Sequence, residues 1–195
     1  APGDLGTREA IAEHIRRCFG AEADAAHIYM TCGAAASLTV SLNAIVNPGD
    51  EVIIPQPSYV CYEPITLLSG GKPVIIETKA EDDFKLTPES LKAAITDKTK
   101  ILILPYPCNP TGAVMEREDL EKIADILKGT DIIVVSDEIY SELTFTGKPH
   151  VSVASVDGMA ERTVTVNGFS KSFSMTGWRL GFACGPDPII KQIKK

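Results

Sequence analysis

The chain has 195 residues, of which 44% are hydrophobic, so it is long enough to bury a core without disulfide support. Its net charge is −7, from 26 acidic and 19 basic residues. This balance argues against a nucleic-acid or anionic-membrane surface, because those partners favour clustered lysine and arginine. The sequence therefore predicts a soluble globular domain that binds neither nucleic acid nor a membrane.

Short apolar, β-branched runs alternate with helix-length amphipathic stretches, which is typical of βαβ units in a mostly parallel sheet. In chain order the pattern predicts a helix at Thr7–Cys18, a strand at His27–Thr31, a helix at Ala35–Val46, a strand at Glu51–Ile54, a helix at Val60–Leu68, a strand at Pro73–Glu77, a helix at Pro88–Ile95, a strand at Ile101–Leu104, a helix at Arg117–Leu127, a strand at Ile132–Ser136, a short helical turn after Glu138, strands at Thr163–Val166 and Leu180–Cys184, and a last helix at Ile189–Lys195. With no interior linker, these elements predict one α/β domain, a three-layer αβα architecture around a mostly parallel seven-stranded sheet.

The five cysteines are widely spaced, with no Cys-x-x-Cys pair and no histidine nearby in metal-ligand spacing. This pattern predicts a reducing compartment and no metal. No apolar run approaches the roughly 18 residues needed to cross a bilayer, and no charged leader precedes an apolar core. We therefore expect a cytoplasmic location.

The stretch Gly168–Gly181 carries a lysine and, eight positions later, an arginine between small residues. Lys171 follows the predicted strand Thr163–Val166, so its ammonium is expected where a parallel sheet ends and ligands commonly bind. A desolvated lysine of lowered pKa forms Schiff bases with carbonyl compounds such as pyridoxal phosphate, and Arg179 suits a bidentate grip on a phosphate. The alternative is two surface cations beside a loop.

Asp137 closes the apolar run Ile132–Val135, so a carboxylate is expected at the end of a buried strand, where it needs a partner. A neighbouring pyridine nitrogen would be kept protonated there, whereas the alternative is an aspartate that caps the next turn. Gly33–Ala35 opens a predicted helix with small residues, which would let a phosphate approach the backbone N–H groups. Taken alone, the same residues are better explained by close helix–sheet packing.

Five segments in register resemble the class I and II pyridoxal-phosphate aminotransferases of fold type I. They are Gly33-Ala34-Ala35, Pro57-Ser58-Tyr59 with Tyr62, Asn109-Pro110-Thr111-Gly112, Ser136-Asp137-Glu138-Ile139-Tyr140 and the segment Gly168–Gly181. The resemblance covers the chain nearly end to end. It implies that residues 1–195 form the large cofactor-binding domain, and that an amino-terminal arm and a carboxy-terminal small domain lie outside it.

The resemblance also implies a role for each matched residue. Lys171 would form the internal aldimine and then shuttle the substrate proton, and Asp137 would keep the pyridine nitrogen protonated. The remaining implied cofactor contacts are Tyr59 stacking on the ring, Asn109 and Tyr140 donating to its phenolic oxygen, and Gly33, Ala34, Ala35 and Arg179 binding the phosphate, with Ser170, Ser172 or Ser174 adding hydroxyl contacts. Glu138 would be structural. The Asn109–Pro110 bond is expected to be cis.

Two positions depart from the family's pattern. Ala35 stands where the family often has a hydroxyl residue, and Gly168 stands where it frequently has a serine. One or two phosphate contacts are therefore expected to be missing. This puts the strength of phosphate binding in doubt, though not the chemistry at Lys171.

The implied activity is transfer of an α-amino group between an amino acid and a 2-oxo acid by a homodimer. Carbon–sulfur lyases and cyclising synthases share every residue named so far, so they stay open, as does the aminotransferase-like domain of a transcription regulator. The resemblance places the arginine that binds the substrate carboxylate after Lys195. The identity of the amino acid therefore does not follow from these residues.

Overall fold

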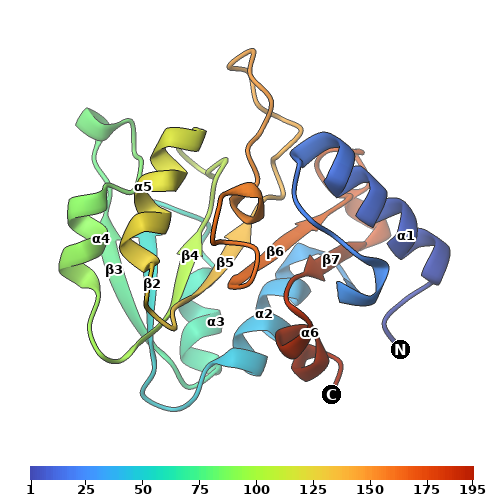
Figure 1. Cartoon of the computed structure of the whole chain (residues 1–195), viewed down its shortest axis with the longest axis horizontal. Coiled ribbons are helices and arrows are strands. Elements are labelled where there is room, and N and C mark those ends of the chain that lie inside the picture. Colours follow the sequence, from blue (N-terminus) through green and yellow to red (C-terminus); the bar gives the residue numbers. More distant parts are fainter.

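One sheet of seven strands runs through the computed structural model, which describes residues 1–195 (Figure 1). The strand order is β1-β7-β6-β5-β4-β2-β3. Strand β7 is antiparallel to both of its neighbours, and all other pairs are parallel. The strands are β1 (Ile28–Thr31), β2 (Glu51–Gln56), β3 (Lys72–Glu77), β4 (Thr99–Leu104), β5 (Ile133–Asp137), β6 (Thr163–Gly168) and β7 (Gly181–Cys184).

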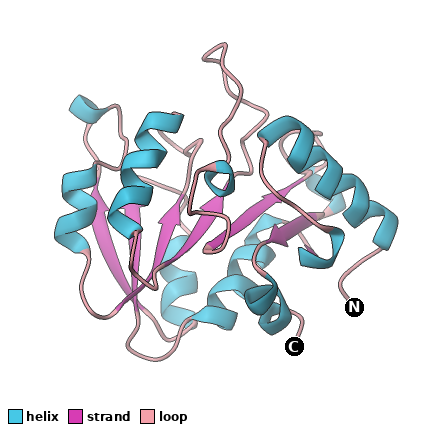
Figure 2. Ribbon diagram, in the orientation of Figure 1, coloured by secondary structure: helices cyan, strands magenta, loops and turns pink.

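Helices lie on both sides of this sheet, which makes the three-layer αβα arrangement expected from the sequence (Figure 2). They are α1 (Leu5–His14), α2 (Ala34–Ile45), α3 (Tyr62–Leu68), α4 (Pro88–Ala94), α5 (Arg117–Leu127) and α6 (Asp187–Ile193). No helix combines the length and apolar character needed to cross a membrane.

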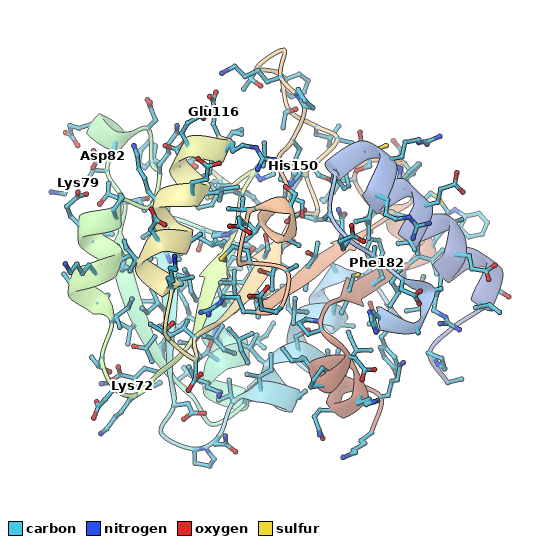
Figure 3. All side chains as sticks on the ribbon, viewed as in Figure 1. Lys72, Lys79, Asp82, Glu116, His150 and Phe182 are labelled. Carbon is cyan, nitrogen blue, oxygen red and sulfur yellow. The ribbon has the colours of Figure 1, made fainter.

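The central strands are apolar on both faces because both faces are covered by helices. On β4, Ile103 joins the apolar cluster that contains Leu42 of α2, whereas its neighbour Leu104 joins the cluster that contains Ile123 of α5. Successive side chains of a strand point to opposite faces, so a continuous apolar run is what a doubly covered parallel strand requires. A third cluster joins α1 to Phe182 of β7, which lies beside α1 in Figure 3.

Three predicted helical segments differ from the structure. The first helix leaves α geometry at His14 and continues as a π-helix over Ile15–Phe19. The last helix begins two residues earlier than predicted, at Asp187, with a proline in its first turn. After Glu138 there is no helix but a run of turns, because Ser141 N–H bonds to the Glu138 carbonyl and Leu143 N–H to the Tyr140 carbonyl, each three residues back.

Candidate active site at the carboxyl ends of the strands

A cavity of about 200 Å³ lies where β5 and β6 end, at the edge of the sheet where parallel α/β folds bind ligands. Eight of the nine residues predicted for the site line this cavity: Ala34, Ala35, Tyr59, Asn109, Asp137, Tyr140, Lys171 and Arg179. Ser170 lines it as well, whereas Ser172 and Ser174 do not. The segments matched in the sequence are thus brought together by the strand order, although they lie far apart along the chain.

Gly33, the ninth predicted residue, stands behind the cavity wall and not in it. Its φ is +93°, and a Cβ atom there would lie 2.7 Å from Nη2 of Arg179. A Cβ on Gly181 would lie 2.4 Å from the carbonyl carbon of Gly33. Both glycines are therefore required for the guanidinium and β7 to approach the start of α2 so closely.

The start of α2 is arranged for an anion. Ala36 and Ser37 donate their N–H groups to the Gly33 carbonyl, at 3.1 and 3.3 Å. The N–H groups of Ala34 and Ala35 have no acceptor in the chain and lie at the positive end of a 12-residue helix. With the guanidinium of Arg179 beside them, these two amides form a site suited to an anion such as a phosphate.

Asp137 is the acid of the cavity, and 5% of it is exposed. Its Oδ2 accepts from the Tyr62 hydroxyl at 2.8 Å, and its Oδ1 accepts from the Ile139 N–H at 3.2 Å. Burial raises the pKa of Asp137 to about 6, against the two hydrogen bonds that lower it. Burial also holds the pKa of Tyr62 well above its usual range, so Tyr62 stays a hydrogen-bond donor.

Tyr62 was given no role from the sequence, although it stands three residues after Tyr59. Tyr62 is the first residue of α3 and Tyr59 lies in the loop before it, and the two rings meet edge to face with centroids 5.7 Å apart. The spacing was thus the available signal. The contact with Asp137 is 75 residues distant in sequence and could not be read from it.

Lys171 is exposed, so the expectation of a desolvated lysine is wrong for this chain. The residue follows the end of β6 instead of lying within it, and its Nζ stands 5.5 Å from the ring centroid of Tyr140. Neither Lys171 nor Arg179 takes part in a salt bridge. Arg179 donates to the Thr176 carbonyl at 3.1 Å.

Glu138 points away from the cavity and is fully buried in a hydrogen-bonded network, in keeping with the structural role expected for it. Its Oε1 accepts from the hydroxyls of Ser136 and Ser152 and from the Val153 N–H, at 2.9, 3.0 and 3.1 Å. Its Oε2 lies 3.0 Å from Nε2 of His150, which is labelled in Figure 3. This network joins the two ends of the loop that projects at the top of Figure 1.

The charges of the cavity fit the cofactor that the resemblance implies. A buried acid faces the cavity with no cation paired to it, and two cations face it with no acid paired to them. A molecule with a cationic ring nitrogen and an anionic phosphate supplies a cation for the acid and an anion for the two cations. The Asn109–Pro110 bond is cis, as predicted, and the amide of Asn109 lines the cavity with the Tyr140 hydroxyl as a second possible donor.

Comparisons with known proteins agree with this geometry. The family model for aminotransferase class I and II matches residues 2–195. An aspartate aminotransferase of Pyrococcus abyssi is 48% identical over 189 residues, which are 96% of this chain and 49% of that protein. An aromatic-amino-acid aminotransferase of Thermococcus litoralis is 43% identical over 192 residues, 98% of this chain and 49% of that protein.

The fold also closely matches that of a relative whose structure has been solved. The crystal structure of an aromatic aminotransferase from Pyrococcus horikoshii matches with a TM-score of 0.95 and 49% identity, covering 98% of this chain and 52% of that one. The chain thus spans about half the length of the relatives it matches. A match that runs through all five sequence segments and the whole sheet shows that the chain belongs to the class I and II aminotransferase family.

Proposed function

We propose that this chain is the pyridoxal-phosphate-binding part of an aminotransferase that moves an α-amino group between an amino acid and a 2-oxo acid. The observation that carries the proposal is the meeting of Asp137, Lys171 and Arg179 around one cavity. These residue types match the three chemical demands of the cofactor, which are a cationic ring nitrogen, an aldehyde and a phosphate. The names of the relatives support the same activity.

Bound pyridoxal phosphate would supply an aldehyde that condenses with amines and a ring that withdraws electrons from the substrate's α-carbon. Asp137 would hold the positive charge on the ring nitrogen through its carboxylate. Arg179 and the N–H groups of Ala34 and Ala35 would hold the phosphate.

Orientation and proton transfer fall to the remaining residues. Tyr59 would cover one face of the ring, and Asn109 and Tyr140 would donate hydrogen bonds to the phenolic oxygen. Lys171 would hold the cofactor in the resting state, and its Nζ, once freed by the incoming amino acid, would carry the proton away from the α-carbon. Its exposed position leaves the amine accessible to the substrate.

Amino acids and 2-oxo acids are the substrates we propose, and a homodimer is the assembly. The relatives include enzymes named for aspartate and for aromatic amino acids, so their names do not choose between an acidic and an aromatic substrate. Transamination is proposed for the whole protein, because the chain spans half of its relatives. Attachment of the cofactor at Lys171 is proposed for the chain itself.

The experiment has two steps. Pyridoxal phosphate is added to the purified chain and trapped with borohydride, and peptide mapping is expected to find the pyridoxyl group on Lys171. Lys148→Ala serves as the control, since Lys148 is exposed but already paired with Glu116 at 2.7 Å. An adduct that disappears in Lys148→Ala, or one that persists in Lys171→Ala, would refute the assignment.

The second step uses the full-length protein and follows the cofactor's absorbance on addition of single amino acids. Conversion to the pyridoxamine form, with release of the matching 2-oxo acid, is the expected result. Release of ammonia or of a thiol without that conversion would contradict transamination and favour lyase chemistry on the same scaffold.

A further inference from the structure

A second group of reactive side chains lies outside the candidate site, where α1 passes into the π-helix Ile15–Phe19. The Sγ atom of Cys18 lies 3.5 Å from Nδ1 of His14. The other ring nitrogen of His14, Nε2, lies 3.1 Å from Oε1 of Glu142 in the turn after β5. The prediction that no histidine stands in ligand spacing to a cysteine is therefore wrong, because His14 and Cys18 are four residues apart on one side of a helix.

The hydrogen bonds fix which ring nitrogen of His14 is free. A carboxylate oxygen only accepts hydrogen bonds, so the nitrogen that faces Glu142 carries the proton. The neutral imidazole then presents Nδ1 to the thiol as an acceptor. The ring of Phe19 packs edge to face on that of His14, with centroids 5.3 Å apart, and restrains its orientation.

This arrangement is that of a nucleophile, a base and a carboxylate that orients the base. A metal ion fits it less well. The ligand atoms lie within 4.8 Å of one another, but His14 turns a different nitrogen toward each neighbour, so one ion cannot take the place of both contacts unless the ring turns. Structural zinc sites use four ligands, and catalytic ones use three and a water.

Cys18 is also accessible, as one of two exposed cysteines in the chain, the other being Cys32. A cavity of about 410 Å³ lies beside this group, and its lining includes His14, Glu142 and Arg17. A small molecule can thus approach His14 and Glu142 from solvent, and the guanidinium of Arg17 adds positive charge to the cavity wall.

We propose that Cys18 is a modification site, with a thiol that His14 and Glu142 activate toward small soft electrophiles. The thiol proton passes to Nδ1 of His14, and Glu142 balances the charge of the resulting imidazolium. The sulfur electron pair then forms a bond to the electrophilic atom, whose leaving group departs with its own bonding pair. With iodoacetamide the new bond is sulfur–carbon and the leaving group is iodide.

The test is a competition among cysteines of one folded chain. The purified chain is treated with limiting iodoacetamide at neutral pH, and labelling at each cysteine is followed by peptide mass spectrometry. Cys18 is expected to react about tenfold faster than Cys32, because His14 can take the thiol proton as the sulfur attacks. The buried Cys108 and Cys184 report folding, since they stay unlabelled as long as the core is intact.

Matched variants then assign the cause. His14→Gln is expected to lower the labelling rate of Cys18 to that of Cys32, and Glu142→Gln is expected to lower it in part. Arg17→Gln should leave most of the rate difference between Cys18 and Cys32. His27→Gln is the control, because its imidazole faces Asp187 at 4.0 Å instead of a thiol. If Cys108 becomes labelled in His14→Gln, that variant has not kept its fold, and the Cys18 rate in Glu142→Gln then decides whether the proposal stands. Equal rates at Cys18 and Cys32, or a Cys18 rate unchanged in folded His14→Gln or Glu142→Gln, would overturn the proposal.

Discussion

Asp137 and Glu138 are adjacent and buried to a similar degree, but they lie on opposite sides of the end of β5. The two sides differ in how many hydrogen-bond donors they offer the carboxylate. On the Glu138 side, two hydroxyls, a backbone N–H and an imidazole surround the acid. On the Asp137 side, only a phenol and one N–H donate to the acid, and its side chain lines the cavity. A carboxylate with a complete set of partners stabilises the fold, whereas one with an incomplete set has capacity left for a ligand.

The sharpest test of this difference is Asp137→Asn, which keeps the shape of the side chain and removes its charge. We expect the half-reaction of the full-length enzyme to slow by at least about a hundredfold, as when a preorganised charge partner is lost from an active site. The fold should survive, because the amide oxygen can still accept from Tyr62. Stopped-flow absorbance measures the rate and circular dichroism the fold; an unchanged rate would show that the cavity does not use this acid.

Glu138→Ala is expected to lower the stability of the fold, whereas Asp137→Asn lowers the reaction rate. Glu138→Ala leaves the donors of Ser136, Ser152 and His150 without their acceptor in a dry interior, so the free energy of unfolding should fall by about 3–5 kcal/mol. Denaturant unfolding measures the loss. Glu138→Gln keeps an acceptor oxygen and should cost clearly less. A stability loss below that of an ordinary surface substitution would mean that the network is dispensable.

The raised pKa of Asp137 predicts how the stability of the ligand-free chain depends on pH. Between its ordinary value of 3.8 and about 6, the unfolded chain has lost a proton that the folded chain still holds, so stability falls as the pH rises through this window. The penalty levels off above pH 6 at about 3 kcal/mol, from a shift of about two pKa units. Unfolding curves of the chain and of Asp137→Asn should therefore diverge from pH 4 to 6. Parallel curves would contradict the assignment.

Tyr62→Phe should have the smallest effect of the four, because it removes one donor from Asp137 and leaves the packing of the ring. The carboxylate loses the hydrogen bond that favours its charged form, so its pKa should rise further and the cofactor should bind about tenfold more weakly. Fluorescence titration with pyridoxal phosphate measures the affinity. Tyr59→Phe keeps the stacking ring, makes no change at Asp137 and serves as the control; equal losses in the two variants would mean that the Tyr62 hydroxyl is not the cause.

The sequence was sufficient for the parts of the molecule that depend on local pattern. All seven strands were predicted, because an apolar, β-branched run between turn residues is what a doubly covered strand requires. Lys171 and Asp137 were found because each follows such a run, and Ala34 and Ala35 because they open a helix, whereas Tyr59, Asn109 and Tyr140 were assigned through the resemblance to the family. Asp137 at the end of its strand is the clearest case.

The contacts that could not be predicted from the sequence depend on which strands become neighbours. The bond from Tyr62 to Asp137 and the approach of Gly33 to Arg179 both follow from the strand order, which no local pattern encodes. The turn after Glu138 was missed for a different, local reason. Its apolar and polar residues suit a helix, but the Asp137 side chain binds the Ile139 N–H and stabilises a turn instead.

The position of β7 also bears on how the protein is made. Strand β1 (Ile28–Thr31) is synthesised well before β7 (Gly181–Cys184), its only neighbour in the sheet. The long segment between them must close before β1 can pair, at an entropic cost that the contacts of β1 with β7 recover only once β7 has been synthesised. The amides at the start of α2 therefore meet Arg179 only when translation has passed Gly181. On the ribosome, the capacity to hold a phosphate is thus acquired only after all five parallel strands, β2 to β6, have been synthesised.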